Sequence, residues 1–246
     1  MADSLALINL SLAASASAVE KLATGAATSD PLRNYAGPRL ASFEPAYADE
    51  LAVLLRWAFE EIQREEGQSV YFRLSTRPID QPRRTLDPHL AEAIVAGAYW
   101  LREPAADTEL AIAYCGAVAP EALAAYQAVA EDVPQAGLLA ITSPDRLHRD
   151  WRAAWARGET GVAERLLARL RPGAALVTVG DFHPATLSWL GAVAGNAIVP
   201  LGVDRFGQSG DIPDLYRAYG IDTDAILDAA ARACLAALRR TADFSL

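Results

Sequence analysis

Five short apolar runs, separated by segments with helical periodicity, limit most strongly what this chain can fold into. The runs are "AIVAGAYWL" (93–101), "ELAIAYCG" (109–116), "GLLAIT" (137–142), "AALVTVG" (174–180) and "AIVPLGV" (197–203). Fully apolar strands joined by helices of ten or more residues are typical of a mostly parallel sheet covered by helices on both faces. The sequence therefore predicts an α/β fold.

The segments between these runs contain recognisable helix starts. Pro120 opens the helical pattern "EALAAYQAVAED", and Ser143 with Pro144 provides an N-cap hydroxyl and an N1 proline in front of "DRLHRDWRAAWAR". We therefore expect helices to begin at these two places.

The N-terminal third has a different organisation. Residues 1–41 include a stretch rich in Ala, Thr, Ser, Gly and Pro, which predicts a loosely attached arm. A helix is predicted in "EPAYADELAVLLRWAFEEIQREEG", ending at Gly67, and a strand in "SVYFRLS" (69–75). The apolar face of that helix consists of Tyr47, Leu51, Leu54, Leu55, Ala58, Phe59 and Ile62.

The segment after this strand has the composition of a linker. "TRPIDQPRRTLDP" contains three prolines and several charges, so we place a domain boundary near residue 85. The expected organisation is an arm (1–41), a small unit (42–84) and an α/β domain (85–246).

Composition excludes several classes of partner. The net charge of −9 and the absence of a Lys- or Arg-rich run argue against nucleic acid and against an anionic membrane surface. No apolar stretch is long enough to span a membrane, and Asp3 stands where a secretory signal has basic residues. Cys115 and Cys234 lie among small apolar residues, as expected of reduced, buried thiols in a cytoplasmic protein.

The stretch "GVDRFGQSGD" (202–211) is similar to a phosphate-binding loop but has Gln208 and Ser209 where such a loop has Lys and Ser or Thr. Two acids, Asp204 and Asp211, would stand beside the phosphates. A turn in which Asp211 caps the next helix, with Pro213 in its first turn, explains the residues better. The candidate ligand or interface residues here are Asp204, Arg205, Phe206, Gln208 and Ser209, among which Arg205 and Phe206 lie at the carboxyl end of a strand.

Asp181 and His183 alternate along an extended segment and would point the same way. This spacing permits a metal pair or a proton-transfer dyad, but a structural, hydrogen-bonded histidine is the competing interpretation. No further ligand stands at a telling spacing, and no nucleophile motif is present. The residues alone assemble no catalytic centre.

Several of these segments together resemble one family. "FEPAYADELAVLLRWAFEEIQ", "GQSVYFRLSTRPIDQP", "GAYWLRE", "AIAYCGAVAPEALAAYQAV" and "VPLGVDRFGQSGDIPDLYRAYGIDTDAIL" look like the C-terminal part of the homodimeric, transketolase-like pyruvate dehydrogenase first component. The resemblance implies that residues 42–84 are the tail of a pyrimidine-binding middle domain. It implies for residues 85–246 a transketolase C-terminal-like domain: a three-layer, mostly parallel five-stranded sheet with "AGAYWL" as its one antiparallel strand.

The resemblance also sets expectations about function. The full family enzyme uses thiamine diphosphate and Mg²⁺ to decarboxylate a 2-oxo acid and pass the acyl unit to a lipoyl group. Its cofactor site and catalytic residues precede the matched region, so this chain is expected to contain no catalytic, cofactor-binding or metal-binding residue. It would contribute domain packing and dimerisation, be inactive alone, form a homo-oligomer and need the missing thiamine-binding domains or subunit. The alternative is a non-catalytic module for small-anion binding or dimerisation.

Overall fold

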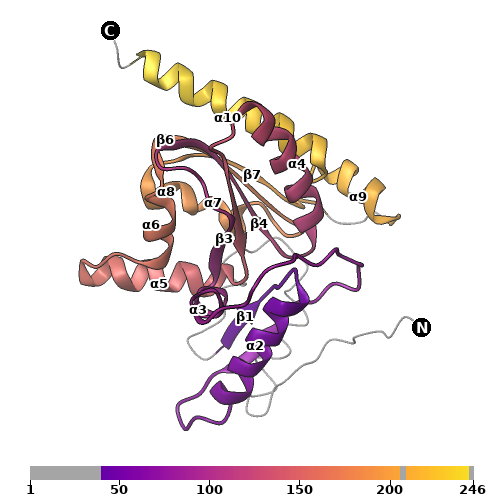
Figure 1. Ribbon diagram of the computed structural model, residues 1–246, viewed down its shortest axis with the longest axis vertical. Coiled ribbons are helices and arrows are strands. Elements are labelled where there is room, and N and C mark those ends of the chain that lie inside the picture. Colours follow the sequence, from indigo (N-terminus) through magenta and orange to yellow (C-terminus); the bar gives the residue numbers. More distant parts are fainter. Residues whose placement is uncertain (1–39, 206–208, 244–246) are drawn as a thin grey trace.

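A five-stranded sheet forms the centre of the computed structural model, which describes residues 40–205 and 209–243, with side chains as far as residue 236 (Figure 1). Its order is β3-β5-β4-β6-β7. The strands are β3 (Ala98–Arg102), β4 (Thr108–Cys115), β5 (Gly137–Ile141), β6 (Leu170–Gly180) and β7 (Ala197–Leu201). Only the β3–β5 pair is antiparallel, and β4, β5, β6 and β7 run parallel. The predicted α/β class and its single antiparallel strand are confirmed.

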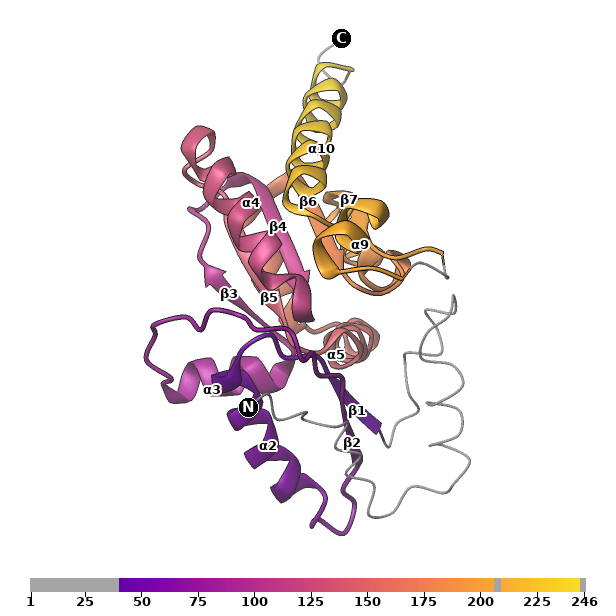
Figure 2. The same ribbon diagram turned by 90° about the vertical axis from the view of Figure 1, so that its right-hand side faces the viewer.

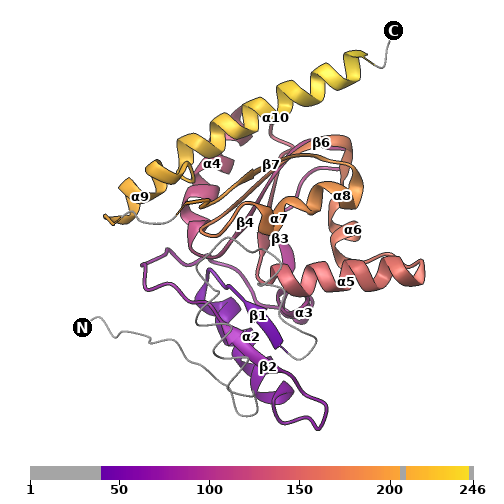
Figure 3. The same ribbon diagram turned by 180° about the vertical axis from the view of Figure 1, so that it is seen from behind.

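Helices cover both faces of this sheet (Figures 1 and 3). On one face, Ile112 of β4 and Val177 of β6 pack with α4 (Ala119–Asp132) and α10 (Thr223–Asp243). On the other face, Ala113 and Leu176 pack with α5 (Pro144–Arg157), α6 (Val162–Leu167), α7 (Ala185–Ser188) and α8 (Leu190–Ala194). Adjacent residues of one strand thus enter opposite cores, which is why the strands read as continuous apolar runs.

Two helix starts agree with the sequence signals. The Ser143 hydroxyl accepts a hydrogen bond from the Arg146 amide at the start of α5, and α4 has Pro120 in its first turn. Asp211 precedes α9 (Ile212–Tyr219) as expected, although its side chain accepts no hydrogen bond from the described amides. Gly220, with φ of 66°, ends α9 in the left-handed conformation.

The run at 93–101 is not a strand throughout. Its first part belongs to α3 (Pro88–Ala96), and β3 begins only after Gly97, which has φ of 115°. The Asp87 side chain accepts from the Leu90 amide and Pro88 stands at N1, so a capped helix start lies upstream of the run. These local signals outweigh the apolar pattern, which cannot separate a short buried helix from a strand.

Residues 40–72 form a small unit beneath the sheet (Figure 2). It contains β1 (Leu40–Phe43), α2 (Ala48–Glu61) and β2 (Ser69–Phe72), and β1 pairs with β2 in parallel. Phe43 stacks on Phe72 with 5.8 Å between ring centroids. The helix ends six residues before the predicted stop at Gly67, and Phe59, placed on its apolar face, is 49% exposed. The boundary near residue 85 stays a prediction.

No helix within 40–205 and 209–243 combines the length and apolarity needed to cross a membrane.

Candidate functional site at the carboxyl ends of the strands

The carboxyl ends of β4 and β6 lie side by side at a point of the sheet that we call the crevice. The chain leaves β4 through the turn η1 (Gly116–Val118) toward α4 on one face, and leaves β6 toward α7 on the other face. Neighbouring parallel strands whose connections diverge in this way mark the place where open α/β sheets bind ligands. In this protein, side chains from the segments that follow β1 and β2 fill that place.

Arg73 lies between two carboxylates in the crevice. Its Nη1 donates to Glu44 Oε2 over 2.8 Å and to Asp181 Oδ1 over 2.6 Å, and its Nη2 donates to the Asp181 carbonyl oxygen over 3.2 Å. Glu44 follows β1, Arg73 follows β2 and Asp181 follows β6. A Cβ at Gly116, whose φ is 70°, would come 3.4 Å from Glu44 Oε2. Glu44 therefore lies close against the end of β4.

The charges in this cluster are not balanced. Burial raises the pKa of Glu44, the positive charge of Arg73 opposes that rise, and Asp181 adds to it. The pKa of Arg73 is raised above its ordinary value, first by Glu44 and also by Asp181. Arg73 consequently stays charged and pairs with two carboxyl groups. Burial makes the charged form of one of them, Glu44, less favourable.

Backbone contacts attach β1 to the same edge of the sheet. The Glu44 amide donates to the Thr142 carbonyl oxygen over 2.7 Å, directly after β5. The Ser143 hydroxyl donates to the Ser42 carbonyl oxygen over 2.5 Å, and Arg149 Nη2 donates to the Leu40 carbonyl oxygen over 3.1 Å. The end of β5 and the first half of α5 thus contact β1 at Leu40 and Ser42 and the residue after it, Glu44.

Residues 73–87, which we call the strap, connect the small unit to the domain and are held by further arginines. Arg77 donates from Nη1 and Nη2 to both carboxylate oxygens of Glu121 over 2.8 and 2.6 Å, and its Nη1 also donates to the Ala117 carbonyl oxygen over 3.2 Å. Its guanidinium carbon lies 5.3 Å from the centroid of the Tyr216 ring. The strap is therefore joined to α4 and α9 through one side chain.

Arg84 holds the other end of the strap. Its Nε and Nη2 donate to the carboxylate of Asp49 over 2.6 and 2.8 Å, and its Nη1 donates to the Tyr99 hydroxyl over 2.6 Å. Its guanidinium carbon lies 5.4 Å from the centroid of the Tyr47 ring. The segment predicted as a linker is thus ordered, and Arg77 and Arg84 bind it to carboxylates of the two neighbouring helices.

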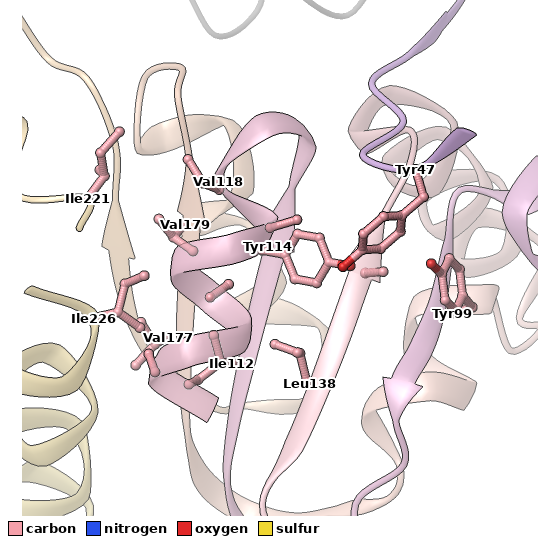
Figure 4. Close-up of a cluster of buried hydrophobic side chains, with 14 of the residues drawn as sticks. Tyr47, Tyr99, Ile112, Tyr114, Val118, Leu138, Val177, Val179, Ile221 and Ile226 are labelled. Carbon is pink, nitrogen blue, oxygen red and sulfur yellow. The ribbon is translucent and has the colours of Figure 1, made fainter. Parts of the chain in front are cut away.

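Buried tyrosines and a carboxylate lie under the Arg84 end of the strap. Figure 4 shows the Tyr47 hydroxyl directed toward that of Tyr114, with Tyr99 beside them. Tyr99 donates a short hydrogen bond to Glu50, which also accepts from the Ala46 and Tyr47 amides over 2.7 and 3.0 Å. Burial raises the pKa of Glu50 and, well above the ordinary range, that of Tyr114. Phenols with raised pKa values stay neutral near pH 7, so Tyr99 acts as a hydrogen-bond donor to Glu50 and Tyr114 carries no charge.

A small cavity lies under the strap. Its volume is about 160 Å³, and it opens between the strap, the start of α2 and the turn η1. The lining residues are Pro45, Ala46, Tyr47, Ala48, Leu51, Leu74, Ser75, Arg77, Ile79, Gln81 and Ala117. Sites for drug-sized ligands usually enclose about 300–1,000 Å³, so this cavity is too small for a nucleotide or a dinucleotide.

The structure gives Asp181 and His183 different partners. Asp181 pairs with Arg73, whereas His183 Nδ1 accepts from the Ala185 amide over 3.2 Å at the start of α7. Within the described part of the chain, no group of three or more His, Cys, Asp or Glu side chains is placed to hold a metal ion. Within the described residues, Asp181 and His183 have no contact with each other, and His183 has the hydrogen bond of the competing, structural interpretation.

The loop after β7 directs its arginine back onto the protein. Arg205 Nη2 donates to the Ala218 carbonyl oxygen over 2.5 Å, and its guanidinium carbon lies 5.7 Å from the Tyr219 ring centroid. Asp204 and Ser209 are exposed. Two other candidates, Phe206 and Gln208, lie outside the described residues.

Sequence reasoning missed the residues that make this site. Arg73, Arg77 and Arg84 stand in a segment whose prolines indicate a linker, and Glu44 stands beside a strand too short to predict. The available signal was the presence of four arginines between residues 73 and 84, in a chain with a net charge of −9.

Comparisons with known proteins address the fold. No protein-family model matches the sequence, and neither does any curated protein. Among solved structures, a transketolase from Leishmania mexicana is similar with a TM-score of 0.61 and 17% identity over 82% of this chain and 26% of the transketolase. A Pichia stipitis transketolase in complex with sedoheptulose-7-phosphate gives 0.56 and 18% identity over 81% of this chain and 26% of that one.

A third similar structure is described as a split-gene transketolase, an inactive beta4 tetramer. Its TM-score is 0.58 at 20% identity, over 85% of this chain and 62% of the other. This chain therefore spans about a quarter of the length of the first two transketolases and less than two thirds of the split-gene polypeptide. These identities show the fold alone, and that fold is the one of transketolase C-terminal domains.

Proposed function

We propose that this chain is the C-terminal domain or subunit of a thiamine diphosphate-dependent, transketolase-type enzyme, and that it is inactive alone. The observation that carries the proposal is that the chain's own side chains occupy the β4–β6 crevice. The position where an open α/β sheet binds a ligand is filled by Glu44 of the small unit and Arg73 of the strap. The sheet then serves to hold a neighbouring unit, which is a packing function.

The small unit supports the need for a further polypeptide segment. A two-stranded sheet is marginal on its own, and parallel strands are normally buried on both faces. Among the described residues, β1 and β2 pair only with each other. The outer edge of β1 already contacts Thr142, Ser143 and Arg149, so the free edge of this sheet is that of β2. We propose that the thiamine-binding part of the enzyme completes this sheet, as expected if residues 42–84 are the tail of a pyrimidine-binding domain.

The proposal assigns the cofactors to the partner. Thiamine diphosphate and Mg²⁺ would be bound by the missing domains or subunit, and none of the residues of the crevice forms a phosphate or metal site. Glu44 and Asp181 already pair with Arg73, and Arg77 already pairs with Glu121. These pairings leave the alternative of a small-anion module with less support.

Two finer statements belong to the same proposal. The reaction would be the pyruvate dehydrogenase type, in which a 2-oxo acid is decarboxylated and its acyl unit passed to a lipoyl group in the cytoplasm, with ketol transfer as the competing reaction. A similar structure is described as an inactive beta4 tetramer, so we also propose that this chain forms a homo-oligomer when alone.

Calorimetry and reconstitution test the proposal together. The chain alone is titrated with thiamine diphosphate and Mg²⁺, and no heat of binding is expected. The chain is then co-expressed with the polypeptide encoded beside it, and the purified complex is assayed for pyruvate decarboxylation and for ketol transfer. Activity that needs both polypeptides supports the proposal. Stoichiometric cofactor binding by this chain alone contradicts it.

A further inference from the structure

The crevice between β4 and β6 has the features of a binding site whose ligand belongs to the same chain. Two carboxylates and one carbonyl oxygen, from segments that are far apart in the sequence, converge on the Arg73 guanidinium. We propose that this crevice is a guanidinium-binding socket, and that its occupation by Arg73 holds the small unit against the five-stranded sheet.

The backbone beside both carboxylates makes contacts that do not involve Arg73. The Glu44 amide donates to the Thr142 carbonyl oxygen. Asp181 stands next to Phe182, whose carbonyl oxygen accepts from the Val203 amide over 2.8 Å. A Cβ at Gly180 would come 2.3 Å from the Phe182 ring, so the chain packs closely on both sides of Asp181. Acceptors that are held in place before binding cost little to organise.

The donor geometry selects the class of ligand. One side chain must donate toward two separate carboxylates and a carbonyl oxygen, and a planar guanidinium offers several fixed donors for this purpose. An ammonium presents a compact charge without that fork. An anionic ligand would meet the negative charges of Glu44 and Asp181, with Asp145 as a further negative charge acting on Glu44. The socket therefore fits a guanidinium and excludes a phosphate.

The guanidinium of Arg73 can be reached from solvent. The Arg73 side chain is 39% exposed, while those of Asp181 and Glu44 are 24% and 15% exposed. Removing the Arg73 side chain should leave the two carboxylates facing an opening that a small soluble cation can enter.

Chemical rescue tests the socket on the full chain, without any partner polypeptide, so its result is independent of the proposed function. In Arg73→Ala we expect a lower melting temperature and amide exchange at Glu44 that is about tenfold faster, while amides of β4 stay protected. Methylguanidinium at low millimolar concentration should raise the melting temperature and slow this exchange. The same compound should not stabilise the wild type, in which the socket is full.

Two further variants make the result decisive. Arg73→Ala combined with Asp181→Asn lacks one carboxylate and should not respond to methylguanidinium, and sodium chloride at equal ionic strength controls for charge screening. Asp181→Asn alone keeps Arg73 and should speed exchange at Glu44 without a response to the compound. The socket is refuted if folded Arg73→Ala shows no rescue, or if the double variant is rescued equally. If Arg73→Ala does not fold, unchanged exchange at Glu44 in Asp181→Asn refutes it.

Discussion

Gly202 lies against the backbone of Phe182, so closely that a Cβ at Gly202 would come 2.3 Å from the Phe182 carbonyl oxygen. The adjacent Val203 amide donates to this same oxygen over 2.8 Å. The segment after β7 is thereby joined to the segment after β6, next to Asp181. This close approach, and no unusual backbone angle, requires glycine at the start of the loop.

Replacing Gly202 should therefore destabilise the protein. In Gly202→Ala the new methyl group would overlap the Phe182 carbonyl oxygen and come 2.7 Å from the Pro184 nitrogen. Since these are backbone atoms, we expect a loss of about 1–3 kcal/mol in the free energy of unfolding, measured with urea. Gly210→Ala is the matched control, because its Cβ would meet nothing closer than 3.7 Å. Equal stability of the two variants would contradict this account.

Tyr99 should contribute to stability through its hydroxyl. In Tyr99→Phe, Glu50 loses a donor and Arg84 loses an acceptor, while the ring stays in place. A buried group left without its partner costs about 1–3 kcal/mol, which urea unfolding at pH 7 can measure. Tyr126→Phe is a suitable control, because the Tyr126 hydroxyl makes no hydrogen bond within the described residues. This change should leave the free energy of unfolding nearly unaltered.

Glu50 should make stability fall as the pH rises. Burial raises its pKa above the ordinary 4.5, so between that value and the raised one the folded protein binds more protons than the unfolded chain. Stability therefore decreases with pH across this window, by about 1.4 kcal/mol for each unit of pKa shift. Glu50→Gln lacks this contribution, so the stability of the variant relative to wild type should increase across the window and then level off.

Urea unfolding from pH 4.5 to pH 8 measures this difference. Glu60→Gln, at an exposed position of the same helix, serves as the control. A difference between Glu50→Gln and wild type that does not change with pH would show that the Glu50 carboxyl is not responsible.

Arg77 should not be replaceable by lysine. Its two Nη atoms bind both oxygens of Glu121 and one also binds the Ala117 carbonyl oxygen, a fork that an ammonium cannot reproduce. We expect Arg77→Lys to lower the free energy of unfolding by about 1–3 kcal/mol. Arg217→Lys, in an exposed pair with Asp214, should change it by less than about 0.5 kcal/mol. Calorimetric melting of both variants decides between a structural fork and a simple surface charge.

The sheet could be predicted because its strands are buried on both faces, which leaves continuous apolar runs such as "AALVTVG" in the sequence. The error at 93–101 arose where a capped helix and a strand share one apolar run on either side of Gly97. β1 was not predicted, because its four residues "LASF" carry too little pattern and depend on contacts with β2 and α5.

The site was harder to predict than the fold. Arg73 lies 29 residues from Glu44 and 108 residues from Asp181 in the sequence, so no local spacing connects them. Asp181 was singled out, but with His183 as its partner, since alternation along the chain was the only geometry available. Only the packing of the small unit on the sheet brings Arg73 to it.

The arginines of the strap have a practical consequence for dissecting this protein. Cutting the chain at residue 85, where composition suggests a junction, would remove the cations that face Asp181, Glu121 and Tyr99 and leave those groups at a newly solvated surface. The stability measured for such a shortened protein would reflect the loss of these ion pairs and hydrogen bonds as well as the sheet itself. Experiments on the five-stranded sheet should therefore keep the strap and replace Arg73, Arg77 and Arg84 one at a time.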